Sequence, residues 1–292
     1  MAMDFLHPAS WADALALKAE RPEAVPIQGG TDVMVELNFD RHRPGALLDL
    51  NPCRELFQVE EQADGRIRLG SGVPYVKIIN RYSDRLPGLA QASRTVGSPQ
   101  IRNRGTVGGN LGGCSPAGDA HPALLATNAV VEVESAARGT RMIDIDDFYV
   151  WVKKSSLEPD ELIRAIWLKP ATGPQYFSKV GTRNAMVIAV CSFGIALHAD
   201  TKTVGAGIGS AGPTPIRPVE AQDFLAANLP WDNATPLSED LQREFGALAA
   251  AAAKPIDDVR GTADYRKHAL SVMARRTLGW AWNDYIAERR AA

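Results

Sequence analysis

Apolar and polar positions along the chain follow patterns that predict helices and strands in alternation. Near the start, Trp11, Ala14 and Leu15 follow Ser10 at helical spacing, with Ser10 placed as the N-cap and Asp13 completing a capping-box-like start. Elsewhere, short apolar or alternating runs bounded by glycine, proline or charged residues indicate strands. The predicted strands are 24–28, 45–50, 66–73, 129–135, 161–168 and parts of 175–200 and 203–212.

Helical patterns dominate the last quarter of the chain, and Pro74 is placed to open a shorter helix over 75–83. Two prolines and a glycine within 168–175 make this segment the best predicted linker. We therefore expect an α+β protein with boundaries at residues 1–58, 59–173 and 174–292. The later predicted helices are 218–227, 238–254 and 265–290.

Composition narrows the class of protein. The chain is 45% hydrophobic and 23% charged, which fits a globular protein and excludes disorder, collagen and a coiled-coil rod. Its net charge of −2 offers no excess of cations for a nucleic-acid surface. No run reaches the ~18 apolar residues of a membrane span, and no secretory signal is recognisable, so we expect a cytoplasmic protein.

Cysteine and histidine are too sparse for a metal centre held by this chain alone. Three separated cysteines, Cys53, Cys114 and Cys191, form no cluster that could bind zinc or iron–sulfur. Cys114 could be a reactive thiol, although a small filler is the better interpretation. The histidines lack metal-ligand spacing, so no metal role is assigned to His7, His42, His121, His198 or His268.

Two glycine-rich segments carry the candidate chemistry. Residues 26–34 run from a predicted strand into a double glycine, and six of the fourteen residues from Gly105 to Gly118 are glycine, against ~1 expected. Glycine lets the backbone approach a ligand closely, and consecutive N–H groups can form an anion site, which suits a pyrophosphate. The alternative is a pair of ordinary turns.

Neither segment matches a familiar nucleotide motif. No Gly-Lys-Ser/Thr occurs, and neither segment contains a proper GxGxxG that opens a helix. Residues 205–212, "GAGIGSAG", match that spacing superficially, but Pro213 and Pro215 follow where a helix would have to begin. We expect a strand and a turn there, which disfavours a Rossmann site.

The segments "QGGTDVM" and "IRNRGTVGGNLGGCSPAGD" resemble those of the FAD-binding subunits of molybdenum hydroxylases, a family that includes the flavin domain of xanthine dehydrogenase and the medium subunit of carbon monoxide dehydrogenase. The similarity also covers "DFYVWVKKSSLEPDELIRAIWL", "KVGTRNAMVIA" and "GPTPIRPVEAQDFL". It implies a PCMH-type (vanillyl-alcohol-oxidase-like) FAD-binding fold of two α/β subdomains, followed by a C-terminal α/β domain of the CO dehydrogenase flavoprotein type.

The resemblance also implies which residues bind FAD. Two segments would line the pyrophosphate, Asp119 would bind cofactor hydroxyls, Ile163 would pack on a ring, and Lys179 would lie near the cofactor. The alternatives are a helix cap for Asp119 and a solvated surface lysine for Lys179. The implied cofactor-binding residues are Ile27, Gln28, Gly29, Gly30, Thr31, Asp32, Thr106, Val107, Gly108, Gly109, Asn110, Ser115, Asp119, Ile163 and Lys179.

The implied role is electron transfer. FAD, held non-covalently because neither segment offers a histidine for a covalent bond, would pass electrons from [2Fe–2S] clusters on a small subunit to NAD⁺ or another acceptor. A large molybdopterin subunit would act on the substrate. The leading candidate is xanthine or another purine, and the alternatives are carbon monoxide, nicotinate-like rings and aldehydes. No catalytic side chain is expected here, and the assembly would be a dimer of heterotrimers.

Two departures and one competing class qualify this expectation. Met186 stands where many relatives carry an acid, and Val96 stands where some carry an aromatic that stacks on adenine. The basic stretch 41–44 and the basic C-terminal helix with Trp280 and Trp282 could contact a partner, although a solvated loop and apolar packing are the simpler interpretations. The competing class is a stand-alone flavin- or nucleotide-binding carrier or regulatory protein.

Overall fold

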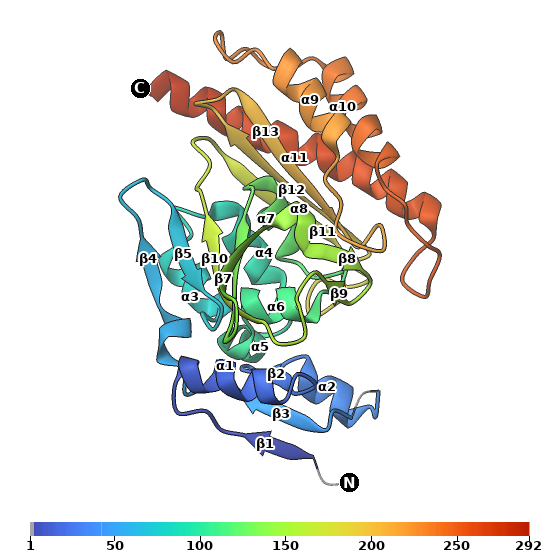
Figure 1. Cartoon of the computed structure of the whole chain (residues 1–292). Coiled ribbons are helices and arrows are strands. Elements are labelled where there is room, and N and C mark those ends of the chain that lie inside the picture. Colours follow the sequence, from blue (N-terminus) through green and yellow to red (C-terminus); the bar gives the residue numbers. More distant parts are fainter. Residues whose placement is uncertain (1–2, 42, 292) are drawn as a thin grey trace. The chain divides into compact units, whose positions relative to one another are not determined.

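The structure of the chain is a computed structural model that describes residues 3–41 and 43–291. The chain divides into two compact units, each assembled from segments that are separate in sequence (Figure 1). The expected boundaries at 1–58, 59–173 and 174–292 stay a prediction. Unit 1 comprises the residues up to 77, 99–114 and 129–168; unit 2 comprises 78–98, 115–128 and those from 169 onward.

Three short parallel strands form the first sheet of unit 1, with β3 in the centre. The predicted cap is confirmed, because the Ser10 hydroxyl accepts a hydrogen bond from the Asp13 N–H at the start of α1. This helix buries Trp11 and Leu15 against the sheet. The elements are β1 (Asp4–Leu6), α1 (Trp11–Glu20), β2 (Val25–Ile27), α2 (Val33–Asn38), β3 (Ala46–Asp49) and the 3₁₀ helix η1 (Arg54–Phe57).

The second sheet of unit 1 is antiparallel, with strand order β4-β5-β10-β6-β7. Its face carries a charged network in which Arg68 donates two 2.8 Å hydrogen bonds to Glu132. The indole of Trp11 donates to Glu134 at 2.8 Å and so joins α1 to this sheet. The elements are β4 (Val59–Glu61), β5 (Ile67–Gly70), α5 (Pro99–Arg104), α6 (Val107–Gly113), β6 (Val130–Ser135), β7 (Gly139–Asp144), α8 (Ile145–Phe148), β8 (Tyr149–Trp151), β9 (Lys154–Ser155) and β10 (Leu162–Leu168).

Unit 2 is built on an antiparallel meander, β11-β12-β13, whose two faces have different side chains. Phe193, Ile195 and Leu197 of β12 belong to a large apolar core that also contains residues of α9, α10 and α11. Figure 1 shows these helices along the meander. The elements are α3 (Tyr75–Arg81), in which the chain passes from unit 1 to unit 2, α4 (Pro87–Thr95), α7 (His121–Ala126), β11 (Gln175–Val180), β12 (Cys191–His198), β13 (Thr203–Gly209), α9 (Val219–Asn228), α10 (Glu239–Ala251) and α11 (Ala263–Ala291).

The other face of this meander is lined with glycine, which allows α7 to lie directly on the sheet. A Cβ at Gly205 would come within 1.9 Å of the Ala126 carbonyl oxygen, and one at Gly207 within 2.5 Å of the Pro122 carbonyl oxygen. The alternating glycines of residues 205–209 therefore serve packing. The prediction of a strand and a turn, rather than a Rossmann motif, is confirmed.

The C-terminal helix packs mainly by apolar contact. Trp282 is buried against Trp231 and Tyr285, whereas Trp280 is half-exposed and contacts Tyr176. Of the basic stretch 41–44, Arg41 and Arg43 are exposed, and His42 lies outside the described residues. Within the described chain, no helix combines the length and the apolar character that crossing a membrane demands.

Candidate functional site

The first glycine-rich segment lies between the end of β2 and the start of α2 in unit 1. Gly30 has φ +72°, a left-handed conformation that disfavours any residue with a Cβ. Gly29 packs directly on the backbone of the second segment, since a Cβ there would lie 2.1 Å from the Arg104 carbonyl oxygen. The segment is thus shaped by one left-handed glycine turn and one close backbone contact.

The second segment is partly helical, although its many glycines favour a loop. Residues Val107–Gly113 form α6, with the Thr106 hydroxyl accepting a 2.8 Å hydrogen bond from the Gly109 N–H as N-cap. Four glycines in seven residues oppose helix formation by about 1 kcal/mol each. The cap and the burial of Val107 and Leu111 offset this cost, so packing outweighs the local preference.

The two segments lie along one another in unit 1. Besides the contact between Gly29 and Arg104, the Thr31 hydroxyl oxygen lies 3.4 Å from the position of a Cβ on Gly105. Further along, the Asp32 carboxylate lies 3.2 Å from the position of a Cβ on Gly113. Predicted residues that are more than 70 positions apart in sequence are therefore neighbours in the structure.

The glycines of α6 differ in what surrounds them. A Cβ at Gly108 would come within 2.5 Å of Ser71, so the fold itself requires glycine there. At Gly109 a Cβ would meet only the Thr106 hydroxyl, at 3.2 Å, and at Gly112 only the terminal methyl of Ile163, at 4.0 Å. Gly109 and Gly112 are three residues apart and therefore lie on one face of α6, where both are exposed. We call this glycine face, which Ile163 borders, the cradle.

One amide side chain in each of the two segments has unused hydrogen-bonding capacity. The Gln28 Oε1 and Asn110 Oδ1 atoms are buried and have no hydrogen-bond partner among the described residues. A buried polar atom without a partner is costly, so these atoms fit a ligand that brings hydrogen-bond donors. Gln28 belongs to the first glycine-rich segment and Asn110 to α6, so each of the two neighbouring segments contributes one such oxygen.

The remaining predicted residues belong to unit 2, where Asp119 and Lys179 form an ion pair of 2.6 Å between Oδ2 and Nζ. Both side chains are over nine-tenths buried, so the alternative of a solvated surface lysine is wrong. The alternative of a helix cap is also wrong, because the N-cap of α7 is Ala120 and Asp119 bonds elsewhere. Ser115 lies nearby in sequence, where its hydroxyl accepts from the Ala117 N–H.

Half-buried Thr95 is the third member of this group, and its role was not predicted from the sequence. Its hydroxyl donates to Asp119 Oδ2 at 2.9 Å, and its carbonyl accepts from Lys179 Nζ at 3.3 Å. Burial raises the pKa of Asp119, while the nearby Lys179 ammonium and the Thr95 hydroxyl oppose the rise. The roles of Ser115, Asp119 and Lys179 in binding a cofactor stay a prediction.

Two further residues near the first segment were also missed. Asn51 and Arg104 both donate to the Gln28 carbonyl oxygen, at 3.0 and 3.1 Å. One signal pointed to Asn51: it follows β3, the strand that pairs with β2, at the same end of the parallel sheet. Nothing in the sequence distinguishes Arg104 from the other arginines of its segment.

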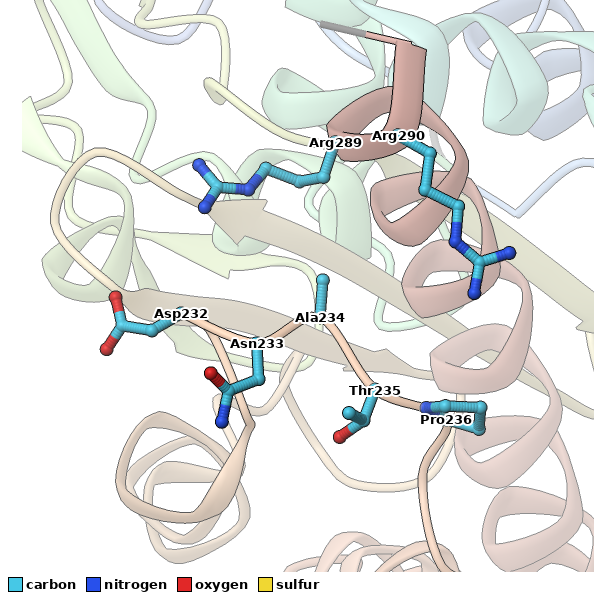
Figure 2. Close-up of a pocket in the computed structure, with 7 residues that line it drawn as sticks. All are labelled: Asp232, Asn233, Ala234, Thr235, Pro236, Arg289 and Arg290. Atoms are coloured by element: carbon cyan, nitrogen blue, oxygen red, sulfur yellow. The ribbon is translucent and has the colours of Figure 1, made fainter.

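Other features do not add to the site. The cysteines of the described chain are buried and unpaired, and burial raises the pKa of the Cys114 thiol to about 11, which fits a packing residue. The described residues contain no cluster of metal-binding side chains. Figure 2 shows a pocket in unit 2 that contains none of the predicted residues; it is lined by Asp232, Asn233, Ala234, Thr235, Pro236, Arg289 and Arg290.

Comparison with protein families identifies the chain. Residues 1–170 match the model of the FAD binding domain in molybdopterin dehydrogenase, and residues 176–281 match the CO dehydrogenase flavoprotein C-terminal domain. The chain belongs to the FAD-binding medium subunits of the molybdenum hydroxylase family. The expected cofactor, FAD, and the expected fold class are thereby confirmed.

Individual relatives agree along the whole chain. The nicotine 6-hydroxylase medium subunit of Paenarthrobacter nicotinovorans is 30% identical, with 95% of this chain and 96% of that protein covered. The xanthine dehydrogenase FAD-binding subunit of Escherichia coli O157:H7 is 31% identical, with 94% of both covered. A chain in the structure of reconstituted CO dehydrogenase from Oligotropha carboxidovorans is 26% identical, with a TM-score of 0.88 and 97% and 99% covered.

Proposed function

We propose that this medium subunit binds FAD non-covalently in the cradle of unit 1 and passes electrons from [2Fe–2S] clusters on a small subunit to NAD⁺ or another acceptor. The observation that carries the proposal is the open glycine face at Gly109 and Gly112, together with the unpartnered oxygens of Gln28 and Asn110. Packing against the protein does not require glycine at these two positions, which supports a role in accommodating a cofactor.

The residues of the cradle would divide the work of holding FAD. The backbone from Gly29 to Thr31 and around Gly109 would accept the pyrophosphate, because glycine permits close approach of N–H groups. Ile163 would pack on an aromatic ring, and the Gln28 and Asn110 amides would take hydrogen bonds from the cofactor. When bound, FAD supplies the isoalloxazine that takes up and releases electrons, and the protein orients it and tunes it.

We further propose that the large subunit of the complex oxidises an aromatic nitrogen heterocycle, with a purine such as xanthine the preferred substrate. Two relatives support this class, since nicotine and xanthine are both named for subunits of about the same identity to this chain. The CO dehydrogenase relation keeps carbon monoxide as the alternative. The substrate would bind to the molybdopterin subunit, so no acid, base or nucleophile is required of this chain.

The proposed partners are a small [2Fe–2S] subunit and a large molybdopterin subunit, in a dimer of heterotrimers in the cytoplasm. The support is that the relatives are themselves named as subunits. Co-expression with both subunits, followed by purification through a tag on this chain, tests the assembly. Recovery of this chain alone, with neither iron nor molybdenum, would instead favour a stand-alone flavin carrier.

The cofactor site is tested by Gly109→Val, with Gly45→Val as the matched control. Gly45 has open space around it and an ordinary φ, and at Gly109 a new Cβ would meet only the Thr106 hydroxyl, at 3.2 Å, so we expect both chains to fold. A branched side chain at 109 should fill the cradle and remove the flavin absorbance of the purified protein, with an unfolding midpoint close to that of wild-type apoprotein. Full flavin occupancy in the Gly109→Val chain would refute the assignment.

A further inference from the structure

Two side-chain donors, from Asn51 and Arg104, meet at the Gln28 carbonyl oxygen, where the first glycine-rich segment leaves the sheet. The parallel pairing of β2 and β3 ends with the hydrogen bond from the Leu50 N–H to the Ile27 carbonyl, 2.8 Å long. One residue later, the Asn51 side chain takes over from the backbone: its Nδ2 donates to the Gln28 carbonyl at 3.0 Å. The sheet is thus extended by one step through a side chain.

The Asn51 amide is itself held on both sides. Its Nδ2 also donates to Asp49 Oδ1 at 2.6 Å, and the Asn51 N–H donates to the same oxygen at 3.0 Å. Its Oδ1 accepts from Arg104 Nη2 at 3.2 Å. With both amide atoms engaged, the side chain has one orientation, and that orientation presents a donor to Gln28.

Arg104 links the two glycine-rich segments. Its Nη2 donates to the Gln28 carbonyl at 3.1 Å as well as to Asn51, while its own carbonyl oxygen packs beneath Gly29. Arg104 therefore contacts the first segment twice: its side chain bonds to Gln28 and its backbone packs against Gly29. We call the side chains of Asp49, Asn51 and Arg104 the clasp.

We infer that the clasp is a positioning device for the cofactor: it holds the Gln28 carbonyl and so fixes the conformation of Gly29 and Gly30 before FAD binds. Two consecutive glycines have more conformational freedom than any other pair, and a flexible segment loses that freedom on binding. Fixing it beforehand improves affinity without adding a contact to the ligand. The inference rests on the proposed binding of FAD in unit 1.

The test uses the full chain, prepared as apoprotein, with FAD titrated by fluorescence and amide hydrogen exchange measured over residues 27–32. Asn51→Asp keeps the size and the acceptor for Arg104 but places a carboxylate oxygen against the Gln28 carbonyl. We expect the Kd for FAD to rise about tenfold and exchange in 27–32 to accelerate, with the unfolding midpoint of the apoprotein little changed. Arg104→Gln should act in the same direction, Arg104→Lys should recover part of the affinity, and exposed Arg54→Gln should change nothing.

The outcomes separate the inference from the proposed function. Wild-type apoprotein that binds no FAD would refute the proposed function. Wild type that binds FAD, with Asn51→Asp and Arg104→Gln equal to it in Kd and in exchange, would refute the clasp. A lower unfolding midpoint with the same gain in stability from FAD as in wild type would also refute it, because the residues would then serve folding alone.

Discussion

Replacement of Lys179 by methionine should expose how the buried ion pair of unit 2 depends on pH. The substitution keeps most of the side-chain volume but leaves the Asp119 carboxylate, which is 7% exposed, without its cation. At 2.6 Å and an effective dielectric constant of about 20, the attraction lost is about 6 kcal/mol. Because desolvation offsets part of this, breaking one partner of a buried pair costs about 3 kcal/mol near neutral pH.

The sign of the pH dependence follows from the carboxyl pKa. Burial already raises the pKa of Asp119 in the folded state, and Lys179 opposes that rise, so the variant should have a folded-state pKa higher still. At pH values between the pKa of Asp119 in the unfolded chain and its higher pKa in the folded chain, the folded state binds more protons than the unfolded state. The free energy of unfolding therefore falls as pH increases, by at most about 1.4 kcal/mol per pH unit. The loss in free energy of unfolding of Lys179→Met relative to wild type, which we call the deficit, should therefore be largest at pH 7–8 and shrink towards pH 4.

Chemical denaturation of wild type and variant between pH 4 and 8 checks this expectation. Lys202→Met is the matched control, since Lys202 forms an exposed pair with Asp232 in the same unit and should cost less than about 1 kcal/mol. Subtracting the wild-type curve cancels the titration of groups common to both chains. A deficit for Lys179→Met that equals the control, or that stays constant down to pH 4, would refute the reasoning.

Three further predictions follow from other contacts. Gly207→Ala should destabilise the protein by about 2 kcal/mol, because the new Cβ would lie 2.5 Å from a backbone oxygen of α7, whereas Gly45→Ala should be neutral in the same denaturation assay. Trp11→Phe removes the 2.8 Å hydrogen bond to Glu134 and should lower the free energy of unfolding in urea by about 2 kcal/mol. An unchanged free energy would mean that water hydrogen-bonds to Glu134 equally well in the variant. Burial lowers the pKa of His121 to about 4, so this ring should stay neutral in NMR spectra down to pH 5, and a midpoint near 6.5 would contradict its burial.

Local signals explain which elements could be predicted from the sequence. The start of α1 was predictable because a cap involves neighbouring residues, Ser10 and Asp13. The strand over residues 203–209 was separable from a dinucleotide motif because Pro213 and Pro215 exclude a following helix. Helix α6 was not predictable, since its glycines favour a loop and the burial of Val107 and Leu111, together with the Thr106 cap, offsets that preference only in the folded chain.

The candidate site shows the same limit at greater sequence distance. Asp119 and Lys179 were each singled out, but as separate residues with separate alternatives, because 60 positions lie between them. The Thr95 carbonyl accepts from Lys179, 84 residues away in sequence, and Arg104 donates to the Gln28 carbonyl, 76 residues away. A contact between a side chain and a remote carbonyl leaves no pattern in one sequence, so these residues became visible only in the folded chain.

The glycines give the most general argument about function. Sequence treats all of them alike, yet the structure divides them by what a Cβ would meet: Gly29, Gly108 and Gly207 would collide with the protein itself, whereas Gly109 and Gly112 would not. The first kind reports on packing and would be needed with or without a cofactor. Glycines of the second kind are free to accommodate a ligand, and the two in α6 lie on the face of the helix that Ile163 borders. The glycine excess of residues 105–118 therefore has two causes, close packing within the protein and room for a ligand. Substitutions at 109 and 112 are the ones that should affect binding without affecting folding.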